Sequence, residues 1–358
     1  MLDLTDDNLI STTIHAHIPI LFYEQGFTSR STCLVPSKFP DTIPIDKSNS
    51  ATSTVLIMAN LVRLATSSKS GNSWNINELE AFNISIVEQE QETFFEGPLP
   101  AYTGPIAFLQ YENCVEELDA SSLALMKRLD LVMTITEDEK EAAVNDFAAE
   151  LLRVMGYEAR STIVRRRKRI RLLMCGEQVY AETDVCVTDI NFGLVLLLLV
   201  QEDRSSHIKP PQDPEPQLVA EAIAAFQSNN AKRVNDLLLD PLPSMVFPGI
   251  TMTGTFPRFY KIKVTADLDY CVRHGLYPTT RTIVHRHTPR VPTRRSGMKS
   301  LDNRAIILRC YEAFKHIGFI QHSKDPFPCI HHRSTLMDVL QQVMTMVWAM
   351  TIRFLVDR

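Results

Sequence analysis

The sequence predicts an α/β protein in which a central mixed sheet is flanked by helices. The first observation is the order of patterns: an amphipathic helix at 138–155, three strand-like runs, a second helix from Asp213, and two more strands. The second is the run Leu194–Val200, which is apolar at every position and typical of a strand covered on both faces. The third is size, because 358 residues with 45% hydrophobic side chains can bury a substantial core.

The first helix and the strands after it have clear boundaries. Thr136 and the acids after it suit a helix start, Val144, Phe147 and Leu151 recur at helical spacing, and Gly156 suits its end. The expected strands are 161–174, 178–188 and 193–202, separated by turn signals. These patterns place an amphipathic helix before a three-stranded meander.

The next segments continue the alternation of helices and strands. Asp213 followed by Pro214 is typical of a helix N-terminus. Two strands are expected at 250–255 and 259–265, followed by a short helix at 267–274 that ends at Gly275. Further helical patterns lie at 55–65, 116–133, 302–316 and 334–356. We therefore expect an N-terminal region of uncertain fold (1–135), an α/β core (136–280), and a basic loop with a helical C-terminal extension (281–358).

The cysteines and apolar runs bound the cellular setting. The seven cysteines are odd in number, irregularly spaced and without a C-x-x-C pair, which indicates reduced thiols rather than a disulfide framework. The N-terminus is acidic and lacks a signal-peptide pattern. No apolar stretch approaches the roughly 20 residues that cross a bilayer. We expect an intracellular protein, cytoplasmic or nuclear, with no membrane partner; the oligomeric state is left open.

Two acids and one cation stand at the ends of neighbouring strand-like runs. Asp184 closes one strand-like run, Glu202 ends the next, and Arg204 follows two residues later. A hairpin between the two strands would bring Asp184 beside Glu202, and a site with few carboxylates suits Mg²⁺ together with phosphate oxygens. The alternative is that both acids are ordinary surface residues at strand ends.

These residues and their order resemble a known family. A helix carrying a Glu, three strands with an Asp on the second and E-x-K at the end of the third, a helix and a strand characterise the PD-(D/E)XK nuclease superfamily, which has the restriction-endonuclease-like fold. The resemblance covers about 138–265. Several short segments are also similar to uncharacterised fungal proteins assigned to that superfamily: Gly176-Glu177, Asp184-Val185, Gln201-Glu202-Asp203, the run 220–227 and Phe259-Tyr260-Lys261. The resemblance implies an αβββαβ core.

The resemblance also implies a nuclease site. Asp184 and Glu202 would hold Mg²⁺ or Mn²⁺, Glu150 would be the helix acid, and Gln217 would lie near the site. Thr183 replaces the motif proline, and Arg204 replaces the lysine. An arginine can stabilise charge on a phosphoryl group but cannot act as a general base. The implied activity is metal-dependent hydrolysis of DNA or RNA; the alternative is a catalytically inactive relative that serves as a binding or scaffold module.

The formal net charge is −5, so contact with nucleic acid would need local basic patches. One candidate is the dense cationic run Arg165–Arg171, which could contact phosphates or could be a solvated strand. Another is the basic loop 281–299, which contains six Lys or Arg and no acid. His285 and His287 in this loop lack the neighbouring ligands that zinc requires. No glycine-rich nucleotide-binding loop is present.

Overall fold

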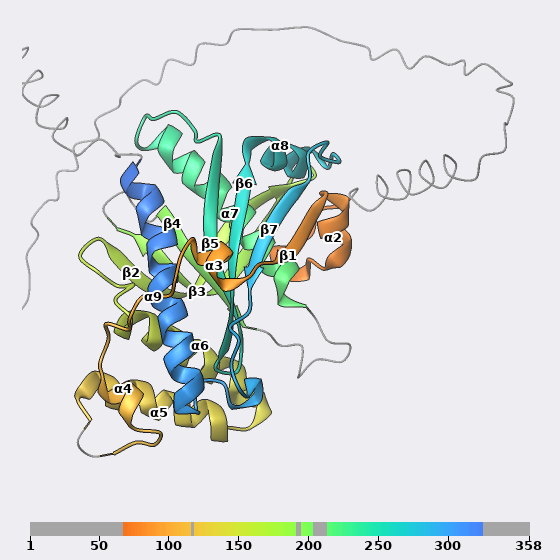
Figure 1. The fold of residues 1–358 in the computed structure, drawn as a ribbon. Helices are drawn as coiled ribbons and strands as arrows, with labels where there is room; N and C mark the ends of the chain where they lie inside the picture. Colours follow the sequence, from red (N-terminus) through yellow and green to blue (C-terminus); the bar gives the residue numbers. More distant parts are fainter. Residues whose placement is uncertain (1–66, 116–117, 191–194, 203–212, 325–358) are drawn as a thin grey trace, which may run out of the picture. The chain divides into compact units, whose positions relative to one another are not determined.

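The computed structural model describes residues 67–115, 118–190, 195–202 and 213–324, all within one compact unit, Ser50–Arg358. A mixed sheet of seven strands lies at its centre, with helices on both faces (Figure 1). The strand order is β1-β7-β6-β5-β4-β3-β2, so β2 is one edge and β1 the other. The strands are β1 (Ile84–Glu88), β2 (Thr162–Met174), β3 (Glu177–Asp189), β4 (Val195–Glu202), β5 (Ser244–Thr253), β6 (Phe256–Thr265) and β7 (Thr282–His287).

Strand directions make the sheet mixed. The first three strands of the 136–280 segment, β2, β3 and β4, pair antiparallel. Strand β5 runs parallel to β4 and antiparallel to β6. Beyond it, β7 pairs antiparallel with β6 and parallel with β1. The order helix α6, strands β2 to β4, helix α7 and strand β5 is therefore the αβββαβ order of the expected elements.

Two helix layers cover the sheet. Helix α7 packs on one face, and its side chains share a core with Ile170, Leu172 and Cys186. Helices α6 and α9 pack on the other face, with Val164, Val185 and Val187. The helices are α2 (Ile76–Ala81), α3 (Gln91–Phe95), α4 (Ala107–Gln110), α5 (Ala120–Thr134), α6 (Glu137–Val154), α7 (Pro214–Asn235), α8 (Ala266–His274) and α9 (Leu301–Lys324), with short 3-10 turns at Gly71–Ser73 and Arg294–Ser296.

The expected elements from 137 to 275 are present with small shifts of their ends. Helix α6 ends one residue before its cap Met155, and Gly156 follows with φ of 74°. The N-terminus of α7 is capped by Asp213, whose carboxylate accepts a hydrogen bond from the Glu215 amide at 3.0 Å. Helix α8 ends at Gly275 in the left-handed conformation. Local signals at chain reversals therefore fixed these boundaries.

The segment expected as a basic loop at 281–299 is only partly a loop. Residues Thr282–His287 form β7, which lies between β1 and β6 in the sheet. Val284 is fully buried while Ile283 is 45% exposed, a pattern too short to predict a strand by itself. Because β1 and β7 come from outside residues 136–280, the core sheet draws on all three regions expected from the sequence.

Some expected features lie outside the residues that the structure describes. The helical patterns at 55–65 and 334–356, and Arg204, lie outside the described residues. Within them, no helix combines the length and the apolar character needed to cross a membrane. The cysteines in the described ranges are all free: Cys114, Cys175, Cys186, Cys271 and Cys310.

Candidate functional site

Strand β3 carries Asp184 at a break in regular strand geometry. Its neighbour β2 pairs with it on both sides of this point, Arg166 with Val185 and Lys168 with Thr183, but the pair Arg167 and Asp184 is missing from the ladder. Arg167 has φ of 51°, in the left-handed region that side chains seldom adopt. Asp184 thus sits where the two strands are locally irregular, as strands often are beside active sites.

On both strands, side chains of the same alternation contact one helix layer before the irregularity and the other layer after it. Residues an even number apart on a regular strand share a face. Val164 nevertheless packs with α6 and α9, whereas Ile170, six residues later, packs with α7. On β3, Ala181 packs with α7 while Val185 packs with the opposite layer. Arg167 and Asp184 lie between these pairs, so the switch of faces occurs at the site.

A second carboxylate approaches Asp184 from α7. Glu221 has no exposed surface, and neither of its carboxylate oxygens has a hydrogen-bond partner among the residues that the structure describes. Burial raises the pKa of Glu221 well above its usual value, and the negative charge of Asp184 raises it further. Asp184 is itself 8% exposed. The structure therefore brings two carboxyl groups together in a buried setting, one from the sheet and one from the helix above it.

Residues around this pair are also enclosed. Gln217 lies one helical turn before Glu221 on α7 and is 9% exposed, so these two side chains share one side of the helix. Cys186 lies on β3 near the pair, and burial raises the pKa of its thiol to about 11. The thiol is therefore protonated at neutral pH and is no nucleophile in this state.

The structure describes two of the other expected site residues, Glu202 and Arg204, only in part or not at all. Glu202 is the last residue of β4, where its backbone lies beside Met252 of β5; its side chain and Arg204 lie outside the described residues. The backbones of Asp184 and Glu202 come to the same end of the strand pair, because Val185 pairs with Val200. Asp184 and Gln217 are near Glu221, while the position of Glu202 is known only for its backbone.

Glu150 belongs to the opposite helix layer. It lies on α6, where its carboxylate forms ion pairs with Arg128 of α5 at 3.7 Å and with Arg153 at 3.5 Å. Its side chain is 17% exposed. Helix α6 packs on the face away from α7, so Glu150 is separated by the sheet from the layer that holds Glu221.

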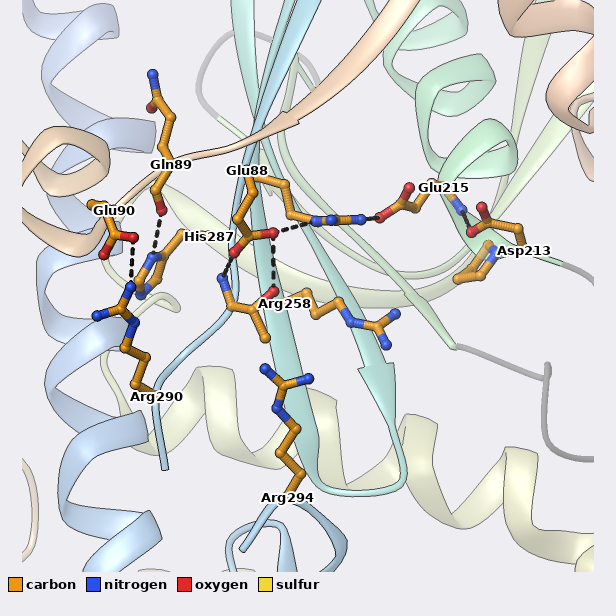
Figure 2. A pocket seen from close by; sticks show the side chains of 12 residues that line it. Glu88, Gln89, Glu90, Asp213, Glu215, Arg258, His287, Arg290 and Arg294 are labelled. Atoms are coloured by element: carbon orange, nitrogen blue, oxygen red, sulfur yellow. Dashed lines mark hydrogen bonds and ion pairs between the residues drawn. The ribbon is translucent and has the colours of Figure 1, made fainter. Parts of the chain in front are cut away.

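An arginine-rich pocket opens at the start of α7 (Figure 2). Its volume is about 600 Å³, and four arginines line it together with four acids. Arg286 is held between Glu88 and Glu215, each at 2.6 Å. The guanidinium groups of Arg258 and Arg294 lie toward the same part of the pocket, as Figure 2 shows. The lining cations are Arg258, Arg286, Arg290 and Arg294, and the lining acids are Glu88, Glu90, Asp213 and Glu215.

Hydrogen bonds fix the inner wall of this pocket. The Tyr260 hydroxyl donates to Glu215 at 2.8 Å and lies 3.1 Å from the Thr251 hydroxyl. Burial, with the nearby charge of Glu215, raises the pKa of Tyr260. Burial opposes ionisation of Glu88, but hydrogen bonds from Arg286 and Thr288 keep its pKa below the usual value. Glu88 is thus ionised at neutral pH, and the wall is a set of mutually satisfied charges.

His287 is a packed histidine of the same pocket. It is 3% exposed, its Nδ1 lies 3.1 Å from the Gln89 carbonyl oxygen, and its ring stacks on Phe94. Burial lowers the pKa of His287, which favours the neutral ring. The contact with the Gln89 carbonyl oxygen and the stacking on Phe94 therefore fix the orientation of the His287 ring.

The pocket and the carboxylate pair lie along one line across the sheet. Thr251 of β5 pairs with Gln201 of β4 on one side and with Arg258 of β6 on the other. Val200, next to Gln201, pairs with Val185, next to Asp184. At about 4.8 Å between strands, Asp184 and Arg258 are roughly 14 Å apart across the sheet. An anionic centre and an arginine-rich wall therefore flank the end of β4.

The described residues offer few possible ligands for a metal ion. Within the described ranges, no three His, Cys, Asp or Glu side chains gather closely enough to hold a metal ion. Mg²⁺ needs only one or two carboxylates when water and phosphate oxygens complete its shell. The Glu221 carboxyl beside Asp184, which has no partner within the described ranges, fits such a donor set, because a buried polar group without a partner is otherwise costly.

Sequence reasoning missed Glu221 as a candidate ligand. It lies within the apolar stripe of α7, between Ala220 and Ala222, and every residue from Pro214 to Gln227 is buried. An acid between two alanines in the apolar middle of a helix is the signal that could have identified it. Comparison with protein-family models finds no match to this chain, and comparison with curated proteins finds none either.

Proposed function

We propose that this protein is a nuclease that hydrolyses phosphodiester bonds in DNA or RNA with the help of Mg²⁺ or Mn²⁺. The observation that carries the proposal is Glu221, a fully buried carboxyl group beside Asp184 that has no hydrogen-bond partner within the described part of the chain. The αβββαβ order of α6, β2, β3, β4, α7 and β5 supports the resemblance to the PD-(D/E)XK superfamily, which implies the same chemistry.

The chain's own groups have distinct roles in this proposal. Asp184 and Glu202 would hold the ion, as the resemblance implies, and Glu221 would add a carboxylate from α7. The bound ion would supply Lewis-acid activation of water and of the phosphoryl group. Gln217, one turn from Glu221, would orient a ligand by hydrogen bonding. Arg204 would balance the charge that develops on the phosphoryl oxygens, and Arg258 would attract the substrate from the neighbouring pocket.

Protonation of Glu221 tunes this arrangement. Burial and the charge of Asp184 favour the protonated form of Glu221 in the absence of a cation. A divalent cation would reverse that preference and release a proton on binding. In this proposal the pair carries one negative charge in the free protein and becomes a dianionic ligand set when the ion arrives and Glu221 loses its proton.

A cleavage assay tests the proposal. Purified protein is incubated with single-stranded and double-stranded DNA and RNA plus Mg²⁺ or Mn²⁺, beside Asp184→Asn and Glu221→Gln. We expect cleavage by the unaltered protein and a loss of about 100-fold or more in each variant, because the ion supplies several kcal/mol of stabilisation. Glu182→Gln is the matched control, since Glu182 lies on the same strand but is exposed.

The assay has clear adverse results. Absence of cleavage by the unaltered protein on all four substrates would contradict the proposal. Equal cleavage by the unaltered protein and Asp184→Asn would contradict it as well, because a contaminating nuclease would then explain the activity. A rate for Glu182→Gln as low as that for Asp184→Asn would show a general effect of charge loss on β3.

The second candidate is a catalytically inactive protein that uses this fold for binding or scaffolding. The observation that favours it is Glu150, whose carboxylate is engaged with Arg128 and Arg153 rather than facing the α7 layer. In this case nucleic acid would bind without cleavage. The assay above separates the two candidates when it is combined with a binding measurement on the same substrates.

A further inference from the structure

A cationic groove lies along the edge strand β2. It is open, has a volume of about 550 Å³, and lies between β2 and the C-terminal half of α7, with α8 contributing at one end. Asp236 is the single acid among its lining residues. The lining cations are Lys168, Arg169, Arg171, Lys232 and Arg273.

The positive charge of this groove is only partly neutralised. Lys232 pairs with Asp236 at 2.9 Å, and Arg273 pairs with Asp269 at 2.8 Å. Within the described part of the chain, Lys168 and Arg171 make no ion pair. Burial, followed by the nearby charge of Arg165, lowers the pKa of Lys168. Lys168 and Arg171 therefore have no acidic partner among the described residues to balance their charge.

The structure divides the basic run of β2 into two groups. Arg166, before the left-handed residue Arg167, forms an ion pair with Asp146 of α6 on the opposite layer. Lys168, Arg169 and Arg171, after it, line the groove at the edge of the sheet. Arg169 also lies over the Tyr180 ring, 3.7 Å from its centroid. Only the second half of the run is therefore available to a ligand in the groove.

Protection of the sheet edge does not account for this charge. Cations on an edge strand discourage pairing with other chains. The edge near Leu173 is already covered, because the Gln227 side chain accepts from the Leu173 amide at 2.7 Å and donates to its carbonyl at 3.1 Å. Lys232 and Arg273 moreover belong to helices rather than to the edge strand. Their convergence with Lys168 and Arg171 indicates a binding surface for an anion.

We propose that this groove binds the phosphodiester backbone of a nucleic-acid strand. A row of cations along a groove matches the regular spacing of phosphates in a polynucleotide. Lys168 pairs in the sheet with Thr183, which precedes Asp184, so the groove begins beside the proposed metal site. The inference rests on the proposed function for its class of ligand, whereas binding in the groove itself needs no metal.

Fluorescence anisotropy in EDTA tests this inference without cleavage. The probe is a short labelled single-stranded oligonucleotide, titrated with the full chain at several salt concentrations. We expect Lys168→Glu/Arg171→Glu to weaken binding about tenfold or more. Lys168→Gln/Arg171→Gln should reduce the slope of log affinity against log salt by roughly 1.4, since each lost phosphate contact accounts for about 0.7 on a single strand. Thermal melting of each variant shows whether it folds.

The matched control is Lys127→Glu/Lys263→Glu, which makes the same change in net charge at two exposed positions away from the groove. We expect this variant to bind as the unaltered protein does. Equal binding by the groove variants, or an equal loss in the control variant, would overturn the inference. So would tighter binding to anionic phospholipid vesicles than to the oligonucleotide. Binding through the groove without any cleavage would instead reject only the proposed catalytic function.

Discussion

Glu221 is a residue whose environment demands a physical explanation. Among the described residues its carboxyl group has no hydrogen-bond partner, and it has no exposed surface. Such a group costs several kcal/mol if it is ionised, so it is either protonated or bound to a cation. Asp184 makes the ionised form still less favourable. The two states differ in charge and role. A protonated Glu221 is an uncharged side chain of the core, and a cation-bound Glu221 is a charged ligand. Both can be measured.

The protonated state of Glu221 predicts a pH-dependent stability. The carboxyl group in the unfolded chain loses its proton near 4.5, whereas burial raises the pKa in the folded chain well above this value. Folding therefore takes up a proton above pH 4.5, and the free energy of unfolding falls as the pH rises. In EDTA, Glu221→Gln should melt at nearly the same temperature as the unaltered protein at pH 4, and a few degrees higher at pH 8.

The melting curves also need a control on β3. Glu182→Gln, at an exposed position, should follow the unaltered protein at both pH values. The explanation fails if Glu221→Gln is less stable than the unaltered protein at pH 8, because the buried carboxyl would then contribute favourable contacts that the structure does not contain.

Residue-level patterns explain why Glu221 was not recognised as a ligand from the sequence. Asp184 and Gln217 were singled out because an order of elements pointed to them, and the structure places both near Glu221. Glu150 was singled out on the same basis but belongs to the other helix layer, since the flank of α6 faces α5 and its arginine. Helical periodicity shows which side of a helix is apolar, but it does not show which layer of a sheet the helix covers.

At the scale of elements, the backbone conformation at Arg167 marks the point where the buried side chains of β2 and β3 change from one hydrophobic core to the other. The left-handed Arg167 lies where the β2 side chains change from the α6 layer to the α7 layer. Lys168 and Arg171, which follow this change, line the groove, whereas Arg166, which precedes it, lies on the α6 side. It also places Asp184 opposite the irregularity. The site and the groove are therefore consequences of the same backbone feature.

Substitutions at Arg167 and Arg169 test this backbone conformation. A β-branched residue is strained at φ of 51°, whereas glycine adopts it freely, so Arg167→Gly should be more stable than Arg167→Val by roughly 1–2 kcal/mol. At Arg169, which lies in regular strand geometry, the order should reverse, because valine suits a strand and glycine does not. Chemical denaturation of the four variants measures the order. The same ranking at both positions would contradict the left-handed conformation of Arg167.

Element boundaries were predictable where local chemistry sets them. Gly156 and Gly275 end helices with positive φ, and Asp213 caps α7. Strand β7 was not predictable, because Arg286 and His287 form a strand only through their partners β6 and β1. Its charged and aromatic contacts, including the ion pairs of Arg286 with Glu88 and Glu215, come from residues far apart in sequence. Such contacts leave no local pattern.

At the scale of the whole molecule, three charged features lie around α7. The carboxylate pair is at its middle, the arginine-rich pocket at its start, and the cationic groove beside its C-terminal half. In our proposal, a polyanion that follows the groove from Lys232 to Lys168 would approach Asp184, because Lys168 pairs with Thr183, the residue before Asp184. This arrangement explains how a chain with a net charge of −5 could attract nucleic acid through local fields.

The long-range part of this arrangement could not be read from the sequence. The basic run at 165–171 is evident in the sequence, but Lys232 and Arg273 join it only after α7 and α8 fold over the edge of the sheet. The helical pattern at 116–133 corresponds to α5, which packs on α6, but no local pattern places β1 beside β7 in the sheet. Sheet order and layer assignment are tertiary properties, which periodicity alone does not contain.

Isothermal titration calorimetry with Mn²⁺ tests the central claim most directly, because it measures ion uptake without any substrate. The account predicts one bound ion in the unaltered protein, release of protons on binding, and the same uptake by Glu182→Gln. It predicts no uptake by Asp184→Asn or Glu221→Gln, each of which should retain its fold in thermal melting. Two results would contradict the proposed metal site: no heat of binding with the unaltered protein, or the same heat of binding with Asp184→Asn as with the unaltered protein.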